Sequence, residues 1–314
     1  MTNFNSIPEI LRKDSIDSLF NANTFNTAWQ HWKNEIQNII GTNYTELDLI
    51  NLGDHLSEIF KSTGGSGRAQ SSLSGGGAAW ESLVCWYINL CCVGSRIVAV
   101  KKMSLVPSPI QDAITVNYGN FACNTESDIT VIIFPDKPQY TNNLDSNTLY
   151  SDGNESIAAL KRGKLNYDYL NKITQLDFDD FEIGVIQCKT NWNDNAQIPM
   201  LWDMIYSANG FRGRNITIGK NGFNIHQTKN FTYSFVTVPS NQNAIYKDTS
   251  VSVKRVTNLS GGNYWGNPTE QHIARSLKEI FTNNYNSGYN SNIRTDIRNC
   301  LPNLGSDLSY FQLT

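Results

Sequence analysis

The fold prediction depends on one stretch, FEIGVIQCKTNW at residues 181–192. Its Gly184-Val185-Ile186 segment is a short apolar run that is typical of a central β-strand. Gln187 and Lys189 lie two residues apart, so on a strand their side chains point to the same face. Because burying a charged lysine is costly unless it is paired, we expect an anionic group opposite Lys189.

Asp128 is the acidic residue that we expect to lie beside Gln187 and Lys189. The stretch SDITVIIF at residues 127–134 is the other clear strand, and a Pro-Asp-Lys-Pro turn ends it. If the two strands pair in antiparallel fashion, Asp128 lies beside residues 187–189. Carboxylate and carbonyl oxygens suit Mg²⁺, which polarises a phosphoryl group and activates a water, and a lysine stabilises the developing charge. Asp128, Gln187 and Lys189 therefore predict a site for phosphodiester hydrolysis.

Glu81 is the one charge inside a predicted buried helix, Ala78–Val93. It lies either on a solvated flank of that helix or inward, toward the metal site. Helical spacing also predicts an N-terminal cap over residues 7–62, and glycines predict a loop over 63–77. The other predicted elements are strands at 97–100, 113–118, 215–218, 231–238 and 249–256, and helices at 156–170, 199–208 and 267–281.

The composition fits a single globular protein of 314 residues, with 39% hydrophobic and 17% charged residues. The six cysteines form no CxxC pair, which predicts reduced core residues of an intracellular protein, and the four histidines have no zinc-ligand spacing. Net charge is −3, but residues 204–269 hold seven basic residues and one acid. This asymmetry favours one positively charged face that binds a polyanion. Charge also varies by chance along any chain, which is the competing explanation.

Together these residues resemble the PD-(D/E)xK nucleases, and most closely the type II restriction endonucleases. The resemblance is carried by Ser127-Asp128 at the head of one strand, by Gln187-Cys188-Lys189 at the tail of the next, and by Glu81 in the preceding helix. It implies an α/β fold with a restriction-endonuclease-like core, in which a central mixed β-sheet is flanked by helices. One domain over 1–314 would comprise the helical cap (1–62), the catalytic core (76–238) and C-terminal recognition or dimerisation elements (239–314).

The resemblance also implies a function. It is Mg²⁺-dependent cleavage of double-stranded DNA at a short specific site, leaving 5′-phosphates, by a prokaryotic cytoplasmic homodimer. Asp128, Gln187 and Glu81 would bind the metal, and Lys189 would act on the water and the transition-state charge. A DNA methyltransferase would be a functional partner but not a bound subunit.

The sequence departs from the family pattern in two places. The acid expected two residues before Lys189 is Gln187, whose amide carbonyl can still bind a metal but lacks the charge, so Glu81 or Glu126 would have to compensate. The one Pro-Asp pair that matches the first two letters of the motif, Pro135-Asp136, lies at the far end of its strand from Asp128. We expect it to form a turn.

The candidate DNA contacts are Asn, Gln, Arg and Lys side chains in loops, because Asn and Gln can read adenine and Arg can read guanine. Turn formation is the competing explanation for the Asn-rich loop after Lys189, and a plain linker for the glycine-rich one. These candidates are Arg68, Gln70, Asn191, Trp192, Asn193, Asn195, Arg212, Arg214, Lys254 and Arg255. Two other functions stay open: a structure-specific or repair nuclease of the same fold, and a non-catalytic DNA-binding protein on a degenerate nuclease scaffold.

Overall fold

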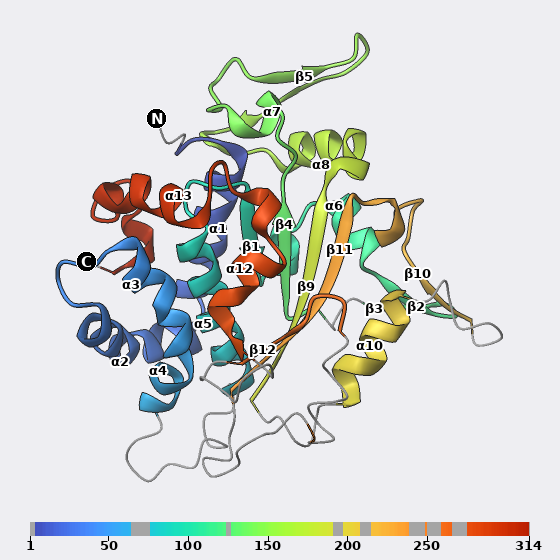
Figure 1. Cartoon of the computed structure of the whole chain (residues 1–314). Coiled ribbons are helices and arrows are strands. Elements are labelled where there is room, and N and C mark those ends of the chain that lie inside the picture. Colours follow the sequence, from blue (N-terminus) through green and yellow to red (C-terminus); the bar gives the residue numbers. More distant parts are fainter. Residues whose placement is uncertain are drawn as a thin grey trace.

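The computed structural model describes residues 4–63, 76–123, 127–190, 197–207, 215–238, 249, 259–265 and 275–313. Within these residues the main sheet is mixed and has helices on both sides (Figure 1). The protein is therefore an α/β protein with a mixed central sheet, as predicted. In spatial order the strands are β1 (Ile97–Val100), β4 (Ile129–Ile133), β9 (Glu182–Lys189), β11 (Asn230–Thr237), β12 (Asn263–Trp265) and β13 (Arg275–Ser276).

The strand directions bring several strand ends to one edge of this sheet. β4 is antiparallel to both β1 and β9, whereas β9, β11, β12 and β13 are parallel to one another. The end of β1, the start of β4 and the ends of β9 and β11 therefore lie at the same edge. We call it the site edge, and it is marked by Val100, Ile129, Lys189 and Thr237.

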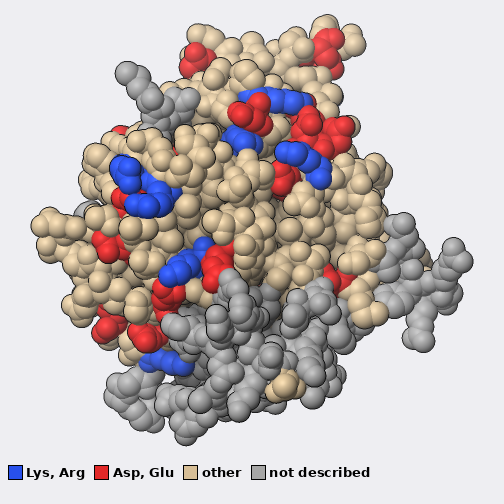
Figure 2. Space-filling view, in the orientation of Figure 1, with Lys and Arg blue, Asp and Glu red and all other residues tan. Residues whose placement is uncertain are grey.

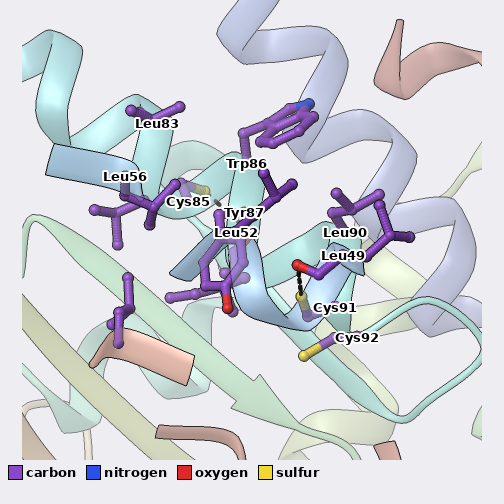
Figure 3. Packing of buried hydrophobic residues seen from close by; sticks show 14 of the residues in the cluster. Leu49, Leu52, Leu56, Leu83, Cys85, Trp86, Tyr87, Leu90, Cys91 and Cys92 are labelled. Atoms are coloured by element: carbon purple, nitrogen blue, oxygen red, sulfur yellow. Dashed lines mark hydrogen bonds between the residues drawn. The ribbon is translucent and has the colours of Figure 1, made fainter. Parts of the chain in front are cut away.

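The predicted helical cap is present and covers one face of the sheet. Because α5 (Gly76–Cys91) is apolar on nearly all sides, it is buried between the sheet and the cap. Figure 3 shows Trp86, Tyr87 and Leu90 of α5 among leucines of the cap, with the Cys91 thiol donating to Leu49 O. The cap helices are α1 (Ile7–Phe20), α2 (Asn23–Ile40), α3 (Glu46–Asn51) and α4 (Leu56–Ser62).

The opposite face of the sheet carries a second apolar cluster. Trp202 and Tyr206 of α10 (Gln197–Ser207) pack there with Tyr233 of β11. The other helices on this side are α6 (Ser108–Ala113) and α8 (Tyr167–Leu176). Three smaller helices are α7 (Pro138–Thr141), α12 (Ile280–Asn283) and α13 (Ile293–Cys300). A second sheet consists of β2 (Val116–Tyr118), β3 (Phe121–Cys123) and β10 (Ile216–Ile218). Two hairpins pair β5 (Leu149–Ser151) with β6 (Ser156–Ala158) and β7 (Leu160–Lys161) with β8 (Lys164–Leu165).

Two predicted helices are wrong. The segment 156–170 forms β6, β7 and β8 before α8 begins, because Arg162 and Gly163 both take positive φ and close a tight β7–β8 turn. In the helix predicted at 267–281, the described residues 275–281 form β13, a 3₁₀ turn at Leu277–Glu279 and only the first two residues of α12. There the pairing of β13 with β12 overrides the local helical pattern.

The cysteines agree with the sequence-based expectation. Five of the six are buried and Cys123 is half-buried. In the described part of the chain, no helix combines the length and the apolar character needed to cross a membrane.

A buried ion pair attaches α1 to the sheet. Arg12 is fully buried, and its guanidinium contacts the Glu9 carboxylate at 3.1 Å. It also donates to Ile97 O at 2.7 Å and to Ser95 O at 3.0 Å, while Gly94 N donates to Glu9 Oε1 at 2.8 Å. Because both charges have several partners, the pair fixes the position of α1 against the start of β1.

We predict that Arg12→Met destabilises the protein by about 3–5 kcal/mol, because Glu9 would remain buried without its counter-charge. Urea unfolding followed by tryptophan fluorescence measures the change. Lys13→Met is the matched control on the same helix: its ion pair with Asp17 is exposed, and exposed pairs contribute little. Equal stabilities of the two variants would show that the Arg12 pair does not hold α1 in place.

Candidate functional site

Asp128 lies beside the end of β9, as the sequence predicts. The β4–β9 ladder is antiparallel, and Ile129↔Ile186 is its last pair at the site edge. Continuing this register places Asp128 opposite Gln187. The predicted pairing of the two strands is therefore confirmed.

A hydrogen bond fixes the Asp128 carboxylate against β9. Cys188 N donates to Asp128 Oδ2 at 2.7 Å. Lys189 O accepts from Val238 N at 3.1 Å on the β11 side, so the main chain of the preceding residue, Cys188, faces β4. The carboxylate thus extends the β4–β9 ladder by one bond and lies between the two polar residues of the Gln187-Cys188-Lys189 segment.

The turn into β4 holds Asp128 from the other side. Ser127 Oγ and Thr130 Oγ1 lie 2.7 Å apart, and both side chains are buried. This hydroxyl pair spans Asp128 in the sequence and closes the turn that leads into β4.

Gln187 points to the α10 face of the sheet. It is only 1% exposed, and its Oε1 accepts from Tyr233 Oη at 2.8 Å. Tyr233 in turn packs against Tyr206 of α10, with ring centroids 5.6 Å apart. The amide carbonyl is therefore held by the core on the α10 side.

Lys189 is the last residue of β9 and is half-buried. By strand alternation its side chain leaves the sheet on the same face as Gln187. Within the described part of the chain, no ion pair joins its ammonium to an acidic residue. Asp128 contacts the main chain of β9, and the expectation of an anion opposite Lys189, which we interpret as a scissile phosphate, stays a prediction.

Glu81 projects from α5 toward the site edge and not onto a solvated flank. Its side chain is 21% exposed, and Oε2 lies 3.2 Å from Nζ of Lys101, which follows β1. Lys101 Nζ also donates to Ala78 O at 2.9 Å and to Ser82 Oγ at 3.1 Å. The ammonium is thus bound across one turn of α5.

The pKa of the Cys188 thiol reflects the charges near the end of β9. Burial raises its pKa well above the usual value, and the negative charges of Asp128 and Glu81 raise it further, whereas Lys101 lowers it. The thiol is therefore neutral and unsuited to act as a nucleophile. Both carboxylates lie within electrostatic range of this one point under α5.

These two carboxylates are the residues that fit a hard cation. They supply oxygen ligands from two different elements, which is the donor chemistry that Mg²⁺ prefers. The Gln187 carbonyl accepts from Tyr233 Oη, and its predicted role as a metal ligand stays a prediction. Among the residues that the structure describes, no group of three or more His, Cys, Asp or Glu side chains is arranged to hold a metal ion.

The predicted DNA contacts lie outside the described residues, as does Glu126. These are Arg68, Gln70, Asn191, Trp192, Asn193, Asn195, Arg212, Arg214, Lys254 and Arg255. Most of the basic residues expected to form a positive face belong to the same segments. On the face shown in Figure 2, the described acidic and basic side chains lie next to one another and form no single-sign patch.

Asp136, of the literal Pro-Asp pair, is at the opposite edge of the sheet. It is 80% exposed and lies 4.0 Å from Nε of Arg96. Its strand passes Glu182 there, since Ile133↔Glu182 is the last ladder pair at that end. Asp136 is therefore separated from the site edge, as expected for a turn residue.

Sequence reasoning did not identify Lys101 and Tyr233 as parts of the site. For Lys101 a signal was present: it directly follows a run of buried apolar residues, Ile97–Val100. For Tyr233 there was none, because its contact with Gln187 spans 46 residues of sequence and depends on how β11 pairs with β9.

Comparison with known proteins returns no relative: no family model and no curated protein sequence matches this chain.

We predict that Tyr233→Phe lowers the free energy of unfolding by about 1–3 kcal/mol, because one buried acceptor position of Gln187 loses its donor. Chemical denaturation measures the loss. Tyr150→Phe is the control, since its hydroxyl contacts Asp152 at an exposed position. If the two variants are equally stable, the Tyr233–Gln187 bond does not fix the amide.

Proposed function

We propose that this protein is a Mg²⁺-dependent endonuclease that hydrolyses phosphodiester bonds in double-stranded DNA. One observation carries the proposal: the Asp128 carboxylate is hydrogen-bonded to the main chain of β9 between Gln187 and Lys189. An acid that can bind a metal and a lysine that can stabilise negative charge are groups that this reaction uses. Glu81 adds a second carboxylate above the same edge.

The order of the elements supports the same proposal. Helix α5, strands β1, β4 and β9, helix α10 and strand β11 follow one another, with β1–β4–β9 antiparallel and β11 parallel to β9. This is the arrangement expected for the PD-(D/E)xK core, with Asp128 opening the second of its strands and Lys189 closing the third. We propose the restriction-endonuclease-like fold on this basis.

Asp128 and Glu81 would hold the metal. Mg²⁺ bound there supplies a Lewis acid that polarises the phosphoryl oxygen and lowers the pKa of a water. Asp128 is oriented for this by the Cys188 amide and by the turn that Ser127 and Thr130 close. Lys189, the last residue of the same strand, would bind the scissile phosphate and stabilise negative charge in the transition state.

We further propose that the enzyme is a type II restriction endonuclease. It would act as a homodimer on a short specific site, leave 5′-phosphates and be accompanied by a separate DNA methyltransferase. A structure-specific nuclease of the same fold would instead cut only at junctions or lesions, so fixed fragments from long DNA distinguish the two.

One observation favours a second candidate, a non-catalytic DNA-binding protein on this scaffold. Gln187 replaces the acid of the motif, and its carbonyl is buried and held by Tyr233. The charge at that position is therefore missing and the amide is committed to the core. Specific retention of DNA without cleavage in Mg²⁺ or Mn²⁺ would identify this function.

We predict that Asp128→Asn and Lys189→Ala each lower the rate of plasmid cleavage in Mg²⁺ at least about 100-fold, as expected for loss of a preorganised charged group at the reacting phosphate. The amide side chain introduced by Asp128→Asn keeps an oxygen that accepts from Cys188 N, so the fold is retained while the charge is lost. Gel analysis of supercoiled and linear plasmid measures the rate.

Asp136→Asn is the matched control, since it removes an acid at the opposite edge of the sheet, and it is expected to cleave like the parent protein. If Asp128→Asn and Lys189→Ala also cleave like the parent, the site is elsewhere.

A further inference from the structure

Lys101 holds an unusual position for a lysine at the end of a strand. It directly follows β1 and is 23% exposed, and its ammonium points to α5 and not to solvent. Its neighbour Lys102 is exposed. Two consecutive lysines thus have different environments, and only the first lies against the proposed metal ligands.

The ammonium of Lys101 has two kinds of partner. Ala78 O and Ser82 Oγ are neutral and are themselves joined, because Ser82 Oγ donates to Ala78 O at 2.7 Å. Glu81 is the one charged partner, at 3.2 Å. Since an ammonium has three donors, Lys101 can stay attached to α5 through the two neutral oxygens when Glu81 turns away.

The Glu81 carboxylate needs a positive partner, because its side chain is only 21% exposed. A charge that is partly removed from water is stabilised by a nearby opposite charge. In the protein without a divalent ion, Lys101 is placed to supply that charge.

We propose that Lys101 is the internal counter-ion of the metal site. It pairs with Glu81 in the metal-free protein, and a divalent cation must displace the Lys101 ammonium to bind the Glu81 carboxylate. The proposal rests on the proposed function, because it takes Glu81 and Asp128 as the metal ligands. Lys101 is then a positioning residue. It keeps the Glu81 carboxylate in place before metal binds and lowers the affinity for the metal.

The test is binding of Mn²⁺ to the full-length protein without DNA, followed by the electron paramagnetic resonance signal of the free ion. Removing a unit charge a few ångströms from a bound divalent ion should tighten binding at least about tenfold. We therefore expect Lys101→Met to bind Mn²⁺ at least about tenfold more tightly than the parent, and Lys101→Arg to bind like the parent. A purely structural role for Lys101 predicts weaker binding instead.

Two further variants make the result specific. Lys102→Met removes the same net charge from the next, exposed residue and should leave the dissociation constant within about twofold, because exposed charges are screened. Lys101→Gln keeps a donor for Ala78 O and Ser82 Oγ without the charge. It gives the same test if the methionine variant does not fold.

Unchanged or weaker Mn²⁺ binding by both Lys101→Met and Lys101→Gln would overturn the proposal, and so would equal tightening by Lys102→Met. The proposed function fails in a different way, through Mn²⁺ binding by the parent that Glu81→Gln and Asp128→Asn leave unchanged. Loss of binding in those two variants, together with tightening in Lys101→Met, supports the proposal.

Discussion

The hydrogen bond from Cys188 N to Asp128 Oδ2 is the interaction on which the proposed site depends. It joins a side chain from the start of β4 to the main chain at the end of β9, so residues 60 positions apart share one fixed geometry. A main-chain donor cannot rotate away, as a side-chain donor can. The direction of the carboxylate is therefore set by the sheet itself, and the central sheet acts as the support of the site.

The two faces of the sheet contribute different chemistry to this edge. On the α5 face, Glu81 pairs with Lys101 near the end of β1, whereas the Asp128 carboxylate contacts the main chain of β9 itself. On the α10 face, Gln187 is held by Tyr233 within an apolar cluster. The Glu81–Lys101 ion pair thus lies against α5, and the Gln187 amide belongs to the core on the α10 side.

The sequence predicted the parts of the site that depend on local pattern. Strand periodicity placed Asp128 beside residues 187–189. A lone charge in an apolar helix drew attention to Glu81, for which the sequence left a solvated flank and an inward position open. The sequence could not predict the Tyr233–Gln187 contact, since it depends on the pairing of β9 with β11. The helix expected at 156–170 failed because positive φ at Arg162 and Gly163 makes a turn, and the helix expected near 275 failed because β13 pairs with β12.

Sequencing the ends of DNA fragments produced by the protein in Mg²⁺ tests the central claim most directly. The account predicts that long DNA yields fixed fragments whose ends carry 5′-phosphates and share one short sequence, and that chelation of the metal with EDTA abolishes them. Intact DNA after incubation with the folded protein in Mg²⁺ and in Mn²⁺ would contradict the assignment of Asp128, Glu81 and Lys189 to phosphodiester hydrolysis.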